Sequence, residues 1–153
     1  MFFNKVFKLL LLFFLLCTIN QCTNSNKVSL DLPKKRWYKT DEVSIKYNNL
    51  SVNNKRNVNF SVSYIYGIQF SEIPIEVHIT SPLNKTEKIS LNIKLFDNKQ
   101  NDIGECLGDY CDFKSLIIKD YVFLEKGEYK IRIINTFDNK YLPNIISLTA
   151  ELN

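Results

Sequence analysis

The stretch Val58, Asn59, Phe60, Ser61, Val62, Ser63, Tyr64 alternates large apolar residues with small polar ones along its whole length. Successive side chains of a β-strand point to opposite faces, so this period of two predicts a strand with one apolar face and one solvated face. An amphipathic helix would instead repeat its apolar residues every three or four positions. The stretch therefore predicts a half-buried β-strand.

The same alternation recurs along the chain. It is found at residues 43–47, 73–79, 89–95, 129–133 and 146–152. Two short apolar runs, at 66–70 and 121–124, are further candidate strands, and residues 113–118 are expected to form one short helical turn. Half-buried antiparallel strands must cover their apolar faces, and two facing sheets do so in a chain of this length. The predicted fold class is therefore all-β, an antiparallel β-sandwich of about seven or eight strands.

Proline and turn residues place some of these strands. Pro74 cannot donate a backbone hydrogen bond, so its strand is expected at a sheet edge or beside a bulge. Turns are expected at residues 81–84 and 138–140, where Ser, Pro, Asn and Asp gather.

The composition sets the broad class of the protein. The chain has 153 residues, of which 45% are hydrophobic and 24% charged, and this allows one ordinary folded domain. With 4 glycines and 1 histidine it has few of the residues that build phosphate loops, zinc sites or histidine-based catalysis. No nucleophile is accompanied by a base and an orienting acid, so we expect a protein that is not an enzyme and binds no cofactor.

The first residues have the pattern of an export signal. Lys5 and Lys8 precede an apolar run at residues 9–16, which is too short for a confident membrane-spanning helix. Cys22 lies between this run and a polar stretch, and this arrangement is similar to the acylation site of bacterial lipoproteins. Cys17 is the competing acceptor, and an uncleaved hydrophobic anchor is the alternative to cleavage.

These features divide the chain into three parts. The predicted parts are a lipoprotein signal peptide at 1–21, a lipid-anchor cysteine with its tether at 22–36, and a β-sandwich domain at 37–153. Several acyl chains on Cys22 would hold the domain on a membrane, because each buried CH₂ contributes about 0.8 kcal/mol. Loss of Lys5 and Lys8 would lower the formal charge from +4 to +2, since all 16 acidic residues follow Cys22. Such a small excess gives no case for nucleic-acid binding.

Cys106 and Cys111 lie in the least strand-like part of the chain, among several acidic residues. In an oxidising compartment, two thiols this close are expected to form a disulfide. The alternative is a metal site, but two cysteines without a second pair or a nearby histidine do not complete a tetrahedral zinc site, and the acidic spacing misses that of a calcium loop. We expect no bound metal.

Trp37 and Tyr38 lie within a basic segment that runs from Lys34 to Lys39. Aromatic residues beside cations are favoured in interfaces, so this pair is a candidate interaction patch. The competing interpretation packs Trp37 on the core of the sandwich. His78 falls on the polar phase of its strand and is expected at the surface.

The order of segments along the chain resembles the gliding-motility lipoprotein family GldH of Bacteroidetes-type bacteria. The resemblance starts from Cys22, Trp37 with Asp41, and the strand at residues 43–47. It continues through Tyr64, Tyr66 and Phe70, Pro82 with Thr86 and Glu87, Leu95 with Asp97, Gly104, Gly108 and Asp109, Phe123, Gly127 and Tyr129, residues 142–145 and Glu151. The chain departs from the family at three places. Tyr64 and Ile65 stand where the family usually has an arginine, and the family's Met-Arg pair is missing near Thr136 and Phe137. The family's glycine-rich turn is altered to hold Cys106 and Cys111.

The resemblance implies a non-enzymatic lipoprotein required for gliding motility, in machinery linked to type IX secretion. Its implied partners are the membrane, through the acyl anchor, and other gliding or secretion proteins of the cell envelope. No acidic run follows Cys22, which favours a domain that faces the periplasm. The alternative is an envelope lipoprotein whose β-sandwich binds a carbohydrate or a peptide, which a solvent-facing row of aromatic residues would favour.

Overall fold

The computed structural model of the chain describes residues 26–153, and these residues form β-strands without any helix. The strands are β1 (Lys27–Asp31), β2 (Arg36–Tyr38), β3 (Glu42–Asn49), β4 (Asn54–Ile65), β5 (Glu72–Thr80), β6 (Thr86–Lys94), β7 (Glu105–Leu107), β8 (Tyr110–Phe123), β9 (Gly127–Asn135), β10 (Tyr141–Pro143) and β11 (Ile145–Leu152). All pairings between them are antiparallel.

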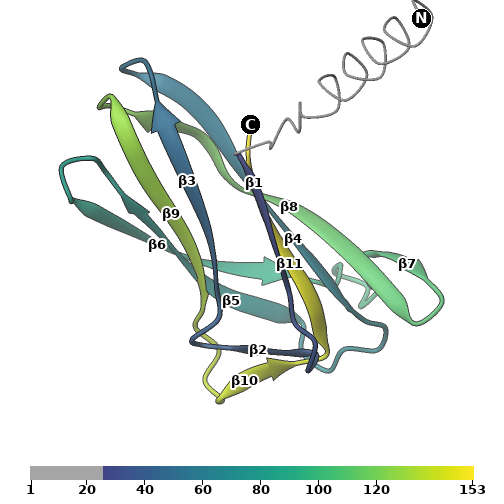
Figure 1. Cartoon of the computed structure of the whole chain (residues 1–153). Helices are drawn as coiled ribbons and strands as arrows, with labels where there is room; N and C mark the ends of the chain where they lie inside the picture. The colour runs from purple at the N-terminus through teal and green to yellow at the C-terminus, as the bar shows by residue number, and fades with distance from the viewer. Residues whose placement is uncertain (1–25) are drawn as a thin grey trace, which may run out of the picture.

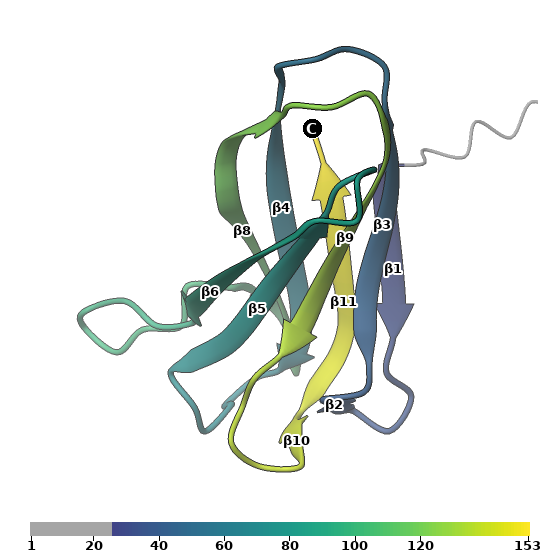
Figure 2. The same cartoon turned by 90° about the vertical axis from the view of Figure 1, so that its left-hand side faces the viewer.

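Two sheets face each other and form the predicted β-sandwich (Figures 1 and 2). The first has five strands in the order β1-β11-β4-β8-β7, and the second has four in the order β3-β9-β5-β6. The short strands β10 and β2 pair with each other across one end of the sandwich, as Figure 1 shows at the bottom. The antiparallel all-β fold class is thus confirmed, with three-residue strands added to the predicted set.

The core lies between the two sheets and is built by the alternation seen in the sequence. Along β4, Val58, Phe60, Val62 and Tyr64 are buried, and the polar residues between them lie on the outer face. Facing residues of the second sheet are equally buried, including Ile45, Ile75 and Ile131. Burial of apolar surface on this scale is the main stabilising contribution to the fold.

Bulges in β8 explain why the sequence of residues 113–118 lacks the alternation of a strand. These residues are part of β8 and form no helical turn, so that prediction was wrong. β8 has two more residues than its partner β4, and the register shifts on both sides of Val58. Each bulge adds a residue that breaks the period of two. Ile117 and Ile118 therefore follow each other in the sequence and both pack against the core, whereas Leu116 is exposed.

Two further predictions differ from the structure. Residues 66–70 form a loop, in which Gly67 has φ +78°, a backbone conformation that ends the strand. Pro74 lies in β5, which is a central strand. Its carbonyl accepts a hydrogen bond from Thr136, just beyond the end of β9, so its missing N–H faces the end of the neighbouring strand. The turn at 81–84 is found as predicted, with the N–H of Asn84 donating to the Ser81 carbonyl at 2.9 Å, and the chain bends at 138–140.

The folded domain begins earlier than predicted. Residues 22–36 were assigned to a tether, but β1 within this range pairs with β11 from Lys27 to Asp31. Leu32 is buried in the core. Val28 and Leu30 pack against that core, which gives β1 the half-buried pattern of an edge strand. Residues 27–32 of the predicted tether therefore belong to the folded domain.

The sandwich has two distinct ends. We name the end with the turns at residues 50–53, 81–85 and 124–126 the three-hairpin end, and the opposite end the β2–β10 end. β1 runs from the three-hairpin side toward the β2–β10 end, parallel to β4 in space although the two are not paired. The chain thus enters the domain from the side of the three-hairpin end.

Candidate docking surfaces

β7 and the start of β8 form a hairpin that adds a short edge strand to the five-stranded sheet (Figure 1). Gly108 has φ +60° in the two-residue turn, a conformation that glycine adopts at little cost. Cys106 lies directly opposite Cys111, and the two form a disulfide with a Cα–Cα distance of 4.0 Å. The bond closes the base of a hairpin whose strand β7 has only three residues.

Large side chains are exposed on this hairpin and next to it. Leu107 is 88% exposed, Tyr110 54% and Tyr66 62%. The backbone N–H of Tyr66 donates to the carbonyl of Asp109 at 2.9 Å, which holds the loop after β4 against the hairpin. The ammonium of Lys35 lies 6.0 Å from the centre of the Tyr110 ring. We name Tyr66, Leu107 and Tyr110 the β7–β8 surface.

A buried contact fixes the hairpin to the core. The Tyr64 hydroxyl donates to the Asp102 carboxylate, and the N–H of Gly104 donates to the same oxygen at 2.8 Å. Burial and the negative charge of Asp102 both raise the pKa of Tyr64, so the hydroxyl stays protonated. Gly104 leaves no room for a Cβ because the Tyr64 hydroxyl occupies that space. The segment before β7 is therefore held in one position.

Trp37 is packed in the core, which confirms the competing interpretation and removes Trp37 from the candidate interaction patch. The Trp37 ring is fully buried, 5.8 Å from Phe60, and its indole N–H donates to the Asp41 carbonyl at 2.7 Å. Tyr38 alternates with Trp37 along β2 and is half-exposed. Its ring lies 5.3 Å from that of Tyr141 on β10.

The β2–β10 end carries further aromatic groups. The Arg36 guanidinium lies 4.7 Å from the centre of the Tyr141 ring, at cation–π distance. Phe70 and Phe137 pack with their ring centres 5.8 Å apart, and together with Tyr141 they line a hollow of about 530 Å³. Aromatic residues and arginine at a hollow are the usual anchors of protein interfaces. Tyr38 and Arg36 of β2 thus both contact Tyr141, a residue from a distant part of the chain.

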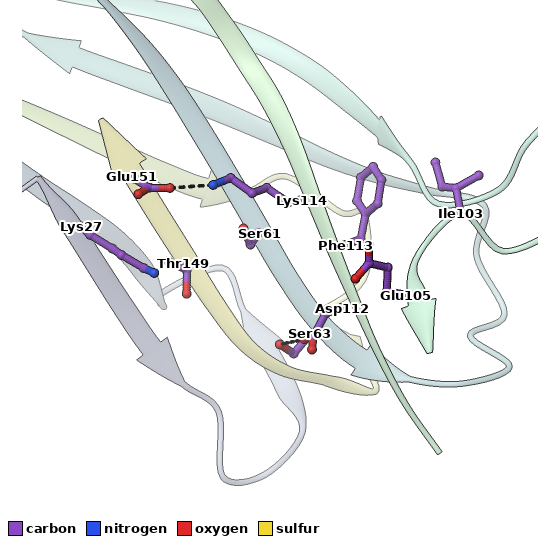
Figure 3. A pocket seen from close by; sticks show the side chains of 10 residues that line it. All are labelled: Lys27, Ser61, Ser63, Ile103, Glu105, Asp112, Phe113, Lys114, Thr149 and Glu151. Carbon is purple, nitrogen blue, oxygen red and sulfur yellow. Dashed lines mark hydrogen bonds and ion pairs between the residues drawn. The ribbon is translucent and has the colours of Figure 1, made fainter. Parts of the chain in front are cut away.

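The outer face of the five-stranded sheet holds a second hollow, of about 520 Å³ (Figure 3). Its lining residues are Lys27, Ser61, Ser63, Ile103, Glu105, Asp112, Phe113, Lys114, Thr149 and Glu151. In Figure 3 Lys114 reaches toward Glu151, with 2.8 Å between the ammonium nitrogen and the carboxylate oxygen. The ammonium lowers the pKa of Glu151.

Short hydroxyl side chains form the floor of this face. The strand register aligns Ser29, Thr149 and Ser61 in one row across β1, β11 and β4. The hydroxyls of Ser29 and Thr149 are 2.8 Å apart, and Ser63 donates to Asp112 in the next row. The face can therefore form many weak polar contacts, but aromatic residues do not line its floor.

The outer face of the other sheet is a charged network. His78 is only 8% exposed, although it was predicted at the surface, because its neighbours cover it. One ring nitrogen contacts the Glu76 carboxylate and the other lies 3.2 Å from the Arg132 guanidinium. Contact with His78 lowers the pKa of Glu76. Arg132 also contacts the Glu42 carboxylate at 3.3 Å, so the network joins β3, β9 and β5.

Asp102, Cys106 and Cys111 bring three ligand-type atoms within 4.8 Å of one another. The two sulfur atoms are bonded to each other, so they are not available as thiolate ligands. Among the described residues this is the cluster most similar to a metal site, and its chemistry is that of a structural disulfide.

A model of the GldH lipoprotein family matches residues 25–149, which is most of the chain and nearly all of the sandwich. The chain belongs to the GldH lipoprotein family. Membership implies attachment to a membrane of the cell envelope. The predicted signal peptide and the two candidate acylation sites, Cys22 and Cys17, lie outside the described residues. None of the described segments is a helix of the length and apolarity that spanning a membrane requires.

Solved structures similar to this GldH-family chain are β-rich proteins of low sequence identity. The C-terminal domain of the sugar-binding protein EclA is 9% identical, with a TM-score of 0.42, over 83% of this chain and 75% of that one. The CBM36-1 domain of a multidomain xylanase from the hindgut metagenome of Trinervitermes trinervoides is 14% identical, with a TM-score of 0.38, over 84% of this chain and 91% of that one. No curated protein matches the chain.

Sequence reasoning missed the β7–β8 surface in this GldH-family domain. Tyr66 was placed in a strand, and the segment around Leu107 and Tyr110 was treated as an acidic turn. The available signal was the dipeptide Gly108-Asp109 between the large apolar residues Leu107 and Tyr110, because such a dipeptide is typical of tight hairpins. This dipeptide does not indicate that the apolar residues on either side of it remain exposed.

Proposed function

We propose that this protein is a non-enzymatic lipoprotein of the gliding-motility machinery and the type IX secretion-linked envelope apparatus, and that it works by docking onto other envelope proteins. Cys22 carries the acyl anchor, and the domain faces the periplasm. The proposal rests on the membership of the chain in the GldH lipoprotein family. Its docking mechanism rests on the exposed groups of the domain.

The observation that carries the docking mechanism is the exposure of Leu107 at 88%, beside Tyr66 and Tyr110, on a hairpin held by a disulfide. Exposed large apolar side chains on a rigid element are typical of protein interfaces, because their burial on binding costs little conformational entropy. Lys35 beside Tyr110 adds a cation that favours an acidic partner surface. A membrane anchor raises the effective concentration of both proteins, so a small interface suffices.

Crosslinking in the native envelope tests the docking mechanism. A photoreactive amino acid at Leu107 should crosslink to a gliding or secretion protein, identified by mass spectrometry, and the same probe at Lys88 on β6 is the matched control. Lys88 is also exposed, but it lies on the other sheet. The variant Leu107→Ser, Tyr110→Ser should lose the partner while its melting temperature stays close to that of the wild type, because both residues are exposed. Equal capture by Lys88 and Leu107 probes would contradict the mechanism.

Carbohydrate or peptide binding remains the second candidate, and the hollow of Figure 3 is the observation that favours it. Its hydroxyl floor and its charged rim suit polar ligands. Sugar sites normally add an aromatic platform, and Phe113 is the aromatic residue among those that line this hollow. A rise in melting temperature with a sugar or peptide, abolished by Ser61→Leu, would support this candidate, because a ligand that binds only the folded state stabilises it.

A further inference from the structure

Exposed aliphatic side chains gather at the three-hairpin end, far from the β7–β8 surface. Leu50 is 77% exposed and Val52 56% exposed in the turn between β3 and β4. Leu83 is 62% exposed in the turn between β5 and β6, and Leu124 is 61% exposed in the turn between β8 and β9. Turns usually carry polar residues, so an aliphatic group at the tip of each of three turns calls for a physical reason.

The three turns form one surface. The side-chain amide of Asn49 donates to the carbonyls of Ser51 and Glu125, both at 2.7 Å, and so links the first turn to the third. Gly127 lies so close to Pro82 that an added Cβ would be 3.0 Å from the proline ring, which places the second turn against the third. The aliphatic groups are therefore held together on a preformed surface.

The described chain begins on the same side of the domain. Lys27 pairs with Glu151, and Glu151 pairs with Asn59, so these residues share one level of the sheet. β4 continues for five residues from Asn59 back to Asn54, so its turn stands about 17 Å beyond that level at ~3.3 Å per residue. Cys22 precedes Lys27 by five residues. At most ~3.6 Å per residue, this segment reaches about 18 Å, so the anchor and the turns can meet one plane.

Charge at the three-hairpin end fits a membrane surface. Lys55, Lys85 and Lys126 are exposed on or beside the three turns. Glu125, between Leu124 and Lys126, accepts a hydrogen bond from the Tyr129 hydroxyl. Lysines around an apolar tip attract anionic lipid headgroups. Aliphatic side chains within such a rim can enter the boundary between headgroups and acyl chains.

We infer that the three-hairpin end rests on the phospholipid bilayer that holds the acyl anchor, with Leu50, Val52, Leu83 and Leu124 inserted at the interface. This contact rests on the lipid anchor of the proposed function and extends it. It fixes the orientation of the domain, because a second contact prevents the sandwich from pivoting about its tether. The β7–β8 surface then points away from the membrane, since Tyr110 pairs with Ile65 at the opposite end of β4.

Site-specific fluorescence on the acylated full-length mature protein tests the contact. In the proposed mature chain Cys22 is acylated and Cys106 is bonded to Cys111, so Leu124→Cys adds one reactive thiol. An environment-sensitive dye at this position should shift its emission to shorter wavelength in vesicles of phosphatidylethanolamine and phosphatidylglycerol. Nitroxide-labelled lipid should quench it. The matched control, Leu107→Cys, should show neither effect.

A second variant separates insertion from mere proximity. Leu50→Ser and Leu83→Ser, combined with the dye at Val52→Cys, should reduce quenching by lipid while the melting temperature stays near that of the singly labelled protein, because both leucines are exposed. Equal quenching at positions 107 and 124, or a blue shift without quenching by lipid, would overturn the inference. The latter result would assign the surface to a protein or a second copy of the chain.

The outcomes also separate this inference from the proposed function. A protein that does not partition into the vesicles contradicts both the anchor and the contact. Water-exposed dyes at position 124 on anchored protein contradict only the contact, and partner capture through Leu107 is measured independently of it.

Discussion

The Tyr64 hydroxyl donates a hydrogen bond to the Asp102 carboxylate, and this contact joins the core of the five-stranded sheet to the loop that precedes β7. The ring of Tyr64 is fully buried in the core, while Asp102 belongs to a segment that is largely exposed. The same carboxylate also accepts a hydrogen bond from the N–H of Gly104, so Asp102 links the core residue Tyr64 to the backbone just before β7. The position of the β7–β8 surface therefore depends on a residue of the core.

Tyr64→Phe should lower the free energy of unfolding by about 1–3 kcal/mol, because the carboxylate of Asp102 loses a partner in a partly buried site. Urea denaturation of the purified domain measures the change. Tyr66→Phe is the control, since its ring is exposed and a surface change of this size shifts stability by less than about 0.5 kcal/mol. Equal stability of the two variants would mean that the contact contributes nothing.

Stability should fall at alkaline pH. Burial raises the pKa of Tyr64 and of Tyr121, with added contributions from Asp102 and Glu87 respectively. Above the ordinary tyrosine pKa of about 10, the unfolded chain loses these protons while the folded state keeps them. The free energy of unfolding therefore decreases as pH rises from about 10. Urea titrations at increasing pH should show this slope, and the double variant Tyr64→Phe, Tyr121→Phe should have a smaller one.

The sequence was sufficient to predict the sandwich, because most of its strands keep a regular alternation of apolar and polar residues. It was insufficient where tertiary contacts override local pattern. The bulges of β8 break the alternation, and β1 is recognised as a strand only through its pairing with β11. Exposure of Leu107 and Leu124 is also invisible in sequence, because a pattern shows that a residue is apolar but not whether another element covers it.

Trp37→Ala should lower the free energy of unfolding by about 3–5 kcal/mol, the usual cost of removing a large buried aromatic residue. The variant also loses the hydrogen bond from the indole to the Asp41 carbonyl. Tyr38→Ala should cost less than about 1 kcal/mol, because the Tyr38 ring is half-exposed. Denaturant titration of both variants distinguishes a core tryptophan from a surface patch, since a patch would give two small and similar effects.

Loss of the disulfide should destabilise the hairpin more visibly than the whole domain. The bond joins residues only five positions apart, and the entropy of closing so short a loop corresponds to about 2 kcal/mol at most. Cys106→Ser should therefore leave the domain folded, with faster amide exchange at Leu107 and weaker partner capture. Wild-type protein treated with a reductant should behave in the same way. Unchanged exchange in both would show that the turn is ordered without the bond.

Asn49→Ala should lower the free energy of unfolding by about 1–3 kcal/mol, because the carbonyls of Ser51 and Glu125 each lose a buried donor. The neighbouring variant Asn48→Ala is the control, since Asn48 is exposed on the same strand. Hydrogen exchange should accelerate in the turns at 50–53 and 124–126, which the Asn49 amide joins. The loosened turns should also insert less well into vesicles, as measured by lipid quenching of a dye at Leu124→Cys. Faster exchange with unchanged quenching would show that bilayer contact does not need a preformed surface.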